Sequence, residues 1–213
     1  MNYISIEGLW INLSAVVTID DAIKYLDTFR DFVIQNDIPC AISCKANYLV
    51  ALGLSTYTEI LGGLYSGDLS GNHRYLRDNY IDFIKHFFPP DYMKVDSQLA
   101  ASNLKGLYSV VRSGLTHEFF VKTISRIDMD SPANITCGIS YDPHDSPQVI
   151  FYVKKYFEDF RNAFEKYYSQ LKSDASLSTN FGKAIQSVKS NMLGRQSASE
   201  TSFIEDVSGK GFP

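Results

Sequence analysis

The fold is decided by the most apolar stretch of the chain, which runs from Ala46 to Tyr65 and reads ANYLVALGLSTYTEILGGLY. Apolar side chains fall on nearly every face of the helix that this stretch predicts, and such a helix belongs in the middle of a bundle. The stretch is nevertheless too polar to span a membrane. Its polar residues are Asn47, Ser55, Thr56, Thr58 and Glu59. Gly53, Gly62 and Gly63 lower helix propensity, so we expect a neighbouring helix to approach closely there.

The composition is that of one globular domain. The chain has 213 residues, of which 45% are hydrophobic and 14% aromatic. Its net charge of −4 argues against general electrostatic binding of nucleic acid but leaves room for a local basic pocket. The segment from Met1 to Trp10 lacks the charged start and long apolar run of a signal peptide. We therefore expect a cytoplasmic protein with no membrane partner.

The cysteines do not form a metal site. Cys40 and Cys44 are four residues apart, with no histidine cluster beside them, and Cys137 is remote in sequence. A zinc site needs three or four ligands at characteristic spacings. We expect no metal and no cofactor, and predict that the three cysteines are buried free thiols in a reducing compartment.

The hydrophobic periodicity predicts a mainly α-helical protein, an antiparallel bundle with a small inserted β-hairpin. Thr18 is expected to cap the first helix, which should end near Asn36 because Pro39 disfavours helix in the residue before it. Further helices are predicted over residues 39–66, 72–88, 97–120 and 148–172.

Other segments predict strands and a tail. Residues 121–147 alternate between apolar and polar side chains, which is typical of a hairpin. The segment from Met1 to Val17 alternates weakly and predicts a short strand or an ordered arm. The single domain is expected to span residues 1–172. Residues 173–213 are rich in serine and poor in apolar side chains, so we predict a polar, poorly packed tail.

One segment of the fourth predicted helix combines the residue types of phosphate chemistry. It contains Arg112, Ser113 and His117, a fixed cation, a hydroxyl and a group that exchanges protons near neutral pH. On an α-helix, residues five apart point about 140° away from each other. Arg112 and His117 would therefore not share a face unless the helix is irregular, which Gly114 permits, or unless the site lies at the helix end or between two copies of the chain. The alternative is a surface arginine and a histidine that caps the helix.

This segment carries a resemblance to a known family. The stretch from Leu107 to Lys122 reads LYSVVRSGLTHEFFVK and resembles a bacterial branch of the HEPN superfamily. Members of that branch carry an arginine, a small polar residue, Gly-Leu, a variable residue and His-Glu, followed by an aromatic residue and a nearby lysine. The upstream run YTEILGGLYSG, from Tyr57 to Gly67, is also similar, as is the order of the predicted elements over residues 19–172.

The resemblance implies a homodimeric helical bundle in which the motif helices of two protomers face each other. It also implies a metal-independent endoribonuclease that cleaves single-stranded RNA. His117 would be the general acid or base in the attack of a ribose 2′-hydroxyl on the adjacent phosphate. Arg112 would stabilise charge on the phosphoryl oxygens, and Ser113 would orient the phosphate. The alternatives are a non-catalytic HEPN-like module, which dimerises or binds nucleotide or RNA, and an unrelated helical protein that matches by chance.

Glu59 is the strongest candidate for supporting the motif. A carboxylate in an apolar helix is costly to bury unless it is paired. We expect Glu59 to form a salt bridge with Arg112 or to orient His117. Pairing with another core cation, or contact with solvent at a helix edge, are the alternatives.

Several charged side chains are weaker candidates for RNA binding. Glu118 and Lys122 flank the motif, although most such charges are simply solvated. Arg74 and Arg77 form a small basic patch with aromatic neighbours, which is a pattern that contacts nucleic-acid backbones. A solvated helix face is the alternative for these two arginines.

Overall fold

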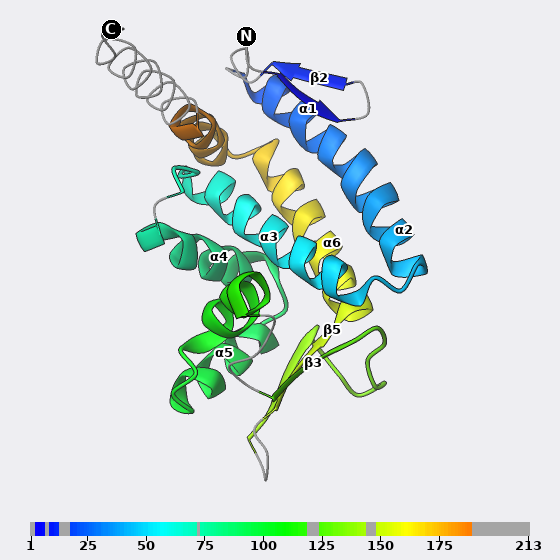
Figure 1. Ribbon diagram of the computed structural model, residues 1–213. Helices are drawn as coiled ribbons and strands as arrows, with labels where there is room; N and C mark the ends of the chain where they lie inside the picture. The colour runs from blue at the N-terminus through cyan, green and yellow to red at the C-terminus, as the bar shows by residue number, and fades with distance from the viewer. Residues whose placement is uncertain are drawn as a thin grey trace, which may run out of the picture.

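The computed structural model describes residues 3–6, 9–12, 18–71, 73–118, 124–143 and 148–188. In this part of the chain the protein is mainly helical, as the periodicity predicts, with a small mixed sheet at one end and a two-stranded hairpin at the other (Figure 1). The hairpin consists of β1 (Tyr3–Ile6) and β2 (Leu9–Asn12). No helix among the described residues is both long and apolar enough to cross a membrane.

A continuous helix follows the hairpin and consists of α1 (Ile19–Phe29), the π-helical η1 (Arg30–Asp37) and α2 (Ile38–Ser43). The hydroxyl of Thr18 accepts a hydrogen bond from the Asp21 N–H, while the Asp21 carboxylate accepts one from the Thr18 N–H, which confirms the predicted cap. The predicted end near Asn36 was wrong. Pro39 lies in the first turn of α2, which follows η1 directly, so the chain stays helical through this proline.

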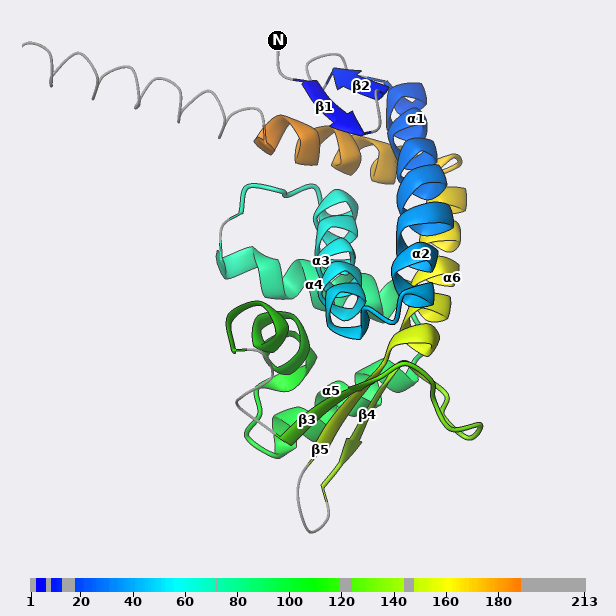
Figure 2. The same ribbon diagram turned by 45° about the vertical axis from the view of Figure 1, so that its right-hand side comes forward.

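The central helix of the bundle is α3 (Asn47–Ser66), as predicted, although it begins later than Pro39. It contacts α2, α4 (His73–Phe87), α6 (Val153–Leu171) and η2 (Tyr108–Glu118), so neighbours surround it (Figure 2). An all-round apolar helix can bury its surface only in such a position.

The glycines of α3 differ in their surroundings. A Cβ added at Gly62 would lie 2.2 Å from the Asn79 carbonyl oxygen of α4, which confirms a close approach there. A Cβ at Gly63 would meet Leu69 and Asp68 of the following loop rather than a helix. At Gly53 the nearest atom belongs to Tyr57 at an ordinary 3.7 Å, so the expected close approach was wrong at that position.

The predicted helix over residues 97–120 is two helices. α5 (Asp91–Ala101) and η2 are separated by a loop in which Asn103 and Lys105 have φ angles of 62° and 61°. Such left-handed conformations end an α-helix, and periodicity does not reveal them. The Asp96 carboxylate accepts a hydrogen bond of 2.7 Å from the Leu107 N–H and so caps the second helix.

The predicted hairpin over residues 121–147 was wrong, because its two strands are not neighbours in the three-stranded sheet of order β3-β5-β4. β4 (Ile139–Asp142) and β5 (Gln148–Tyr152) form an antiparallel pair, and β3 (Ile124–Asp128) runs parallel to β5. The sequence analysis assigned β5 to the start of the last helix. A short apolar run that leads directly into a helix has no periodicity of its own, which explains the error.

A further helix over residues 175–188 corrects the predicted tail. Leu177, Phe181, Ala184 and Ile185 are buried in the hydrophobic core, and the Phe181 ring packs edge-on against Tyr25 of α1. Four apolar residues at helical spacing suffice to bury one face of this short helix, despite its serine-rich surroundings. The packed domain therefore extends to residue 188, and residues 189–213 lie outside the described part.

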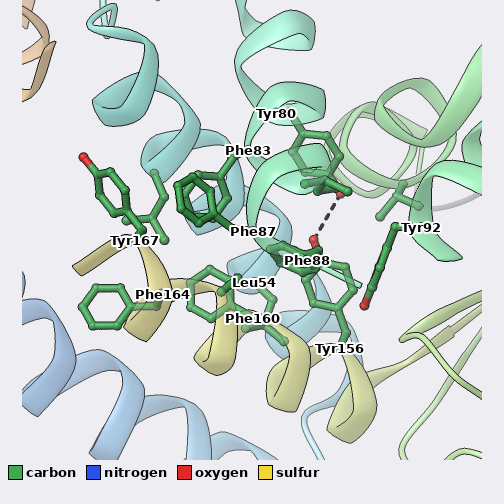
Figure 3. Packing of buried hydrophobic residues seen from close by; sticks show 14 of the residues in the cluster. Leu54, Tyr80, Phe83, Phe87, Phe88, Tyr92, Tyr156, Phe160, Phe164 and Tyr167 are labelled. Atoms are coloured by element: carbon green, nitrogen blue, oxygen red, sulfur yellow. Dashed lines mark hydrogen bonds between the residues drawn. The ribbon is translucent and has the colours of Figure 1, made fainter. Parts of the chain in front are cut away.

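The core between α3, α4, α5 and α6 is rich in aromatic side chains (Figure 3). It also contains a buried chain of hydroxyls. The Tyr156 hydroxyl lies 3.2 Å from that of Tyr80 and 3.0 Å from that of Thr58. Burial raises the pKa of Tyr156 to about 12, so this phenol stays neutral and its proton remains available for hydrogen bonding.

The cysteine prediction holds only in part. All three cysteines are free, and Cys137 is buried, but Cys40 and Cys44 are exposed. Both lie at the end of the long N-terminal helix, where their side chains are exposed.

Candidate functional site

The helix that carries the motif is π-helical, which changes the geometry expected from its sequence. η2 comprises Tyr108–Glu118. The hydrogen bonds of a π-helix run between residues five apart, so such residues are separated by about one turn. Positions 112 and 117 therefore lie near one another on the helix surface, and the α-helical separation of about 140° does not apply. The side chains of His117 and Glu118, and Lys122 as a whole, lie outside the described part of the structure.

Arg112 forms an ion pair with Glu59, as the sequence analysis expects. Arg112 Nε lies 3.2 Å from Glu59 Oε2, and Nη2 donates a hydrogen bond of 3.2 Å to Oε1. The pair joins η2 to the central helix α3. Only 16% of the arginine side chain and 11% of the glutamate side chain are exposed. The alternative of a surface arginine is therefore wrong, and Glu59 neither pairs with a different core cation nor reaches solvent at a helix edge. The expected contact of Glu59 with His117 involves a side chain outside the described part.

Thr116 completes the surroundings of the guanidinium. Arg112 Nη1 donates a hydrogen bond to Thr116 Oγ1, whose own proton is donated to the Arg112 carbonyl oxygen at 2.8 Å. The guanidinium thus has partners on the central helix and on its own helix. These contacts fix the orientation of the side chain, because a planar guanidinium with several bonded donors has little rotational freedom.

Two tyrosines pack beside this ion pair. The rings of Tyr108 and Tyr80 meet edge-on with centroids 5.6 Å apart. Burial, the charge of Glu59 and a hydrogen bond to Glu59 raise the pKa of Tyr108 to about 12. Tyr108 is therefore a neutral donor to the same carboxylate that holds Arg112. Further along η2, the Tyr48 hydroxyl of α3 donates a hydrogen bond to the Leu115 carbonyl oxygen.

An open groove of about 760 Å³ lies beside η2. Its polar lining comes from α4, from the loop before η2 and from η2 itself, and it consists of Arg77, Asn103, Lys105, Tyr108, Ser109 and Ser113. The groove thus brings Ser113 of the motif together with Arg77 of the basic patch identified in the sequence. The Arg74 side chain lies outside the described part of the chain.

The other groove residues were missed by the sequence analysis. It treated residues 97–120 as one helix, so Asn103 and Lys105 had no reason to lie beside Ser113. The break at these two residues turns the chain around the groove. The sequence signals for it are Asn103, a residue type that adopts left-handed conformations readily, and Gly106, whose φ of 82° favours glycine.

Comparison with known proteins adds no constraint: no family model, curated protein or solved structure matches this chain.

Proposed function

We propose that the protein is a metal-independent endoribonuclease of HEPN type that acts as a homodimer on single-stranded RNA. The ribose 2′-oxygen attacks the adjacent phosphorus and the bond from phosphorus to the 5′-oxygen breaks. One proton leaves the 2′-hydroxyl and one is delivered to the departing 5′-oxygen. The products are a cyclic phosphate and a free 5′-hydroxyl.

The observation that carries this proposal is the π-helical register of η2. It brings positions 112 and 117 within about one turn of each other, with Ser113 between them on an open groove. In the proposed reaction His117 transfers protons, and Ser113 donates a hydrogen bond to a phosphate oxygen. Arg112 stabilises negative charge on the phosphoryl group from a position fixed by Glu59 and Thr116. Glu59 is then a positioning residue.

The same register changes the role of the dimer in this proposal. In an α-helical motif, a second protomer was one way to bring an arginine and a histidine together. A π-helical motif supplies both positions within one protomer, so the homodimer follows only from the HEPN resemblance. Light scattering coupled to gel filtration measures the oligomeric state, and a monomer that cleaves RNA would remove the dimer from the proposal.

A second candidate function is favoured by the burial of Arg112. The guanidinium is only 16% exposed and is neutralised by Glu59, which weakens its pull on a phosphate in the groove. These contacts suit a non-catalytic module in which the ion pair stabilises the bundle while the groove binds RNA or nucleotide.

Cleavage assays in EDTA distinguish the two candidates. Purified protein is incubated with structured and unstructured RNA, and the products are tested for a cyclic phosphate end. Because a positioned proton-transfer group contributes about 10²- to 10⁴-fold in rate, His117→Ala should abolish nearly all cleavage. His86→Ala is the matched control, since His86 is an exposed histidine on α4 whose ring nitrogen contacts the Asp82 carbonyl oxygen of its own helix. Cleavage that survives in His117→Ala, or that requires a metal, contradicts the mechanism.

A further inference from the structure

We propose that the groove beside η2 binds the sugar–phosphate backbone of single-stranded RNA and that Arg77 and Lys105 are its phosphate-binding cations. That the bound RNA leads toward Arg112 and Ser113 rests on the proposed ribonuclease function. Binding to the groove does not, because it follows from the charge, shape and donors of the groove itself.

The charge of the groove is opposite to that of the protein. The chain carries a net charge of −4, yet the described residues that line the groove include two cations and no carboxylate. Two acidic side chains on the neighbouring elements are already engaged. Glu59 holds Arg112, and the Asp96 carboxylate accepts the Leu107 N–H. The groove is therefore a local positive site on an acidic molecule, which concentrates polyanions there.

The backbone conformation of the loop before η2 places Lys105 at the groove. Asn103 and Lys105 both adopt left-handed conformations, which cost on the order of 1 kcal/mol or more for a residue other than glycine. Gly106 follows with φ of 82°, and a Cβ there would lie 2.4 Å from Asp96 Oδ1. The chain adopts this tight loop between α5 and η2 instead of an uninterrupted helix. Strained residues of this kind cluster at binding sites, because the surrounding contacts must hold them in one arrangement.

The remaining lining supplies hydrogen-bond donors and an aromatic surface. Ser109 and Ser113 are separated by four residues on η2, so their hydroxyls follow one side of the groove. Tyr108 contributes its aromatic ring, because its hydroxyl is engaged with Glu59. Its ring is held by the edge-on contact with Tyr80. Hydroxyl donors with a fixed ring match a backbone phosphate and its neighbouring base.

The size of the groove also fits. Sites for ligands of drug size measure about 300–1,000 Å³, and this groove measures about 760 Å³, enough for about one or two nucleotides. Because the groove is open, an RNA strand can enter and leave it. Ser113 then brings the bound backbone to the residue next to Arg112, where the proposed cleavage takes place.

The test measures binding separately from cleavage. A fluorescent 2′-O-methyl oligoribonucleotide lacks the attacking hydroxyl, so its anisotropy reports binding alone, in EDTA and over a salt series. We compare wild type with Arg77→Glu/Lys105→Glu. Each lost phosphate contact lowers the slope of log affinity against log salt by about 0.7 on a single strand, so the double variant should lose about 1.4. Its affinity should fall by about tenfold or more.

The matched control is Arg161→Glu/Lys183→Glu, which changes net charge by the same amount at two exposed residues outside the groove lining. The control should bind like the wild type. Equal loss in both double variants, or unchanged binding in Arg77→Glu/Lys105→Glu, overturns the groove proposal. Arg77→Gln/Lys105→Gln, with circular dichroism of each variant, provides the same test if charge reversal prevents folding.

The groove proposal and the ribonuclease proposal can be refuted independently. If the wild type cleaves no RNA but the groove variant alone loses binding, the ribonuclease proposal is wrong and the groove stands. If the wild type cleaves RNA and the groove variant binds and cleaves normally, the groove proposal is wrong and the ribonuclease stands.

Discussion

Replacing Glu59 with alanine should lower the free energy of unfolding by about 3 to 5 kcal/mol, because it leaves the Arg112 guanidinium buried without a countercharge. Both contacts between the two side chains are 3.2 Å long, and neither side chain is exposed by more than 16%. A domain is typically stable by about 5 to 15 kcal/mol, so the loss would be a large share of the total. Tyr108 would also lose the carboxylate that accepts its hydroxyl.

Two further variants separate charge from volume. Glu59→Gln keeps the shape and one acceptor oxygen, so its cost should be smaller, about 1.5 to 3 kcal/mol. Glu59→Leu combined with Arg112→Met removes both charges and keeps the space filled with apolar atoms. That double variant should lie within about 2 kcal/mol of the wild type and be more stable than Glu59→Leu alone.

Urea unfolding followed by far-ultraviolet circular dichroism measures all of these changes. A loss below about 1 kcal/mol in Glu59→Ala refutes the reasoning, and so does a double variant whose cost is the sum of the two single changes. The Glu59→Leu/Arg112→Met protein is also informative for function. It should fold and yet cleave no RNA if Arg112 contacts the phosphate.

Three smaller changes test other parts of the structure. Gly62→Ala should cost about 3 kcal/mol or more in urea unfolding, because its Cβ would lie 2.2 Å from the Asn79 carbonyl oxygen, whereas Gly53→Ala on the same helix should stabilise by up to about 1 kcal/mol. Burial raises the pKa of Asp159, so its folded form binds a proton more tightly than its unfolded form and its contribution to stability is lost as pH rises through the folded pKa. The unfolding free energy of the wild type relative to Asp159→Asn should therefore increase on acidification, and a constant difference between pH 3 and pH 7 would contradict this. The pKa of Tyr108 is likewise raised, from 10.0 to about 12, so stability should decline as pH rises from about 10 to about 12. Alkaline unfolding should show a shallower decline in Tyr108→Phe than in the wild type, and identical curves would count against the assignment.

Much of the architecture could be predicted from side-chain chemistry alone. The apolar pattern of α3 predicts burial on most sides, and the structure places this helix in the middle, with Leu49 left 66% exposed near its start. The capping box between Thr18 and Asp21 is a local feature that spans four positions, and it is present. The Glu59–Arg112 pair spans 53 residues of sequence, but it could be anticipated because a carboxylate on a buried helix needs a cation.

Other elements were mispredicted where one local pattern fits two conformations. Pro39 interrupts helix in most contexts, yet here α2 follows η1 directly and the chain stays helical through the proline. The apolar run of β5 could belong to a strand or to the helix that follows it. Only pairing with β3 and β4 selects the strand. The helix over residues 175–188 shows little apolar surface in sequence, and its four buried side chains gain stability only because the core is there to receive them.

In the candidate site too, some features follow from the sequence and others only from tertiary packing. The sequence by itself determined which residues are present, a cation, a hydroxyl and a histidine within six positions, and that Glu59 needed a partner. Only the tertiary structure decided how they are arranged. Hydrogen bonds to the residue five positions away, rather than four, set the π-helical register of η2, and side-chain periodicity does not encode that choice. The groove depends on left-handed residues in a loop and on Arg77 from another helix, so it exists only once α4, α5 and η2 have packed together.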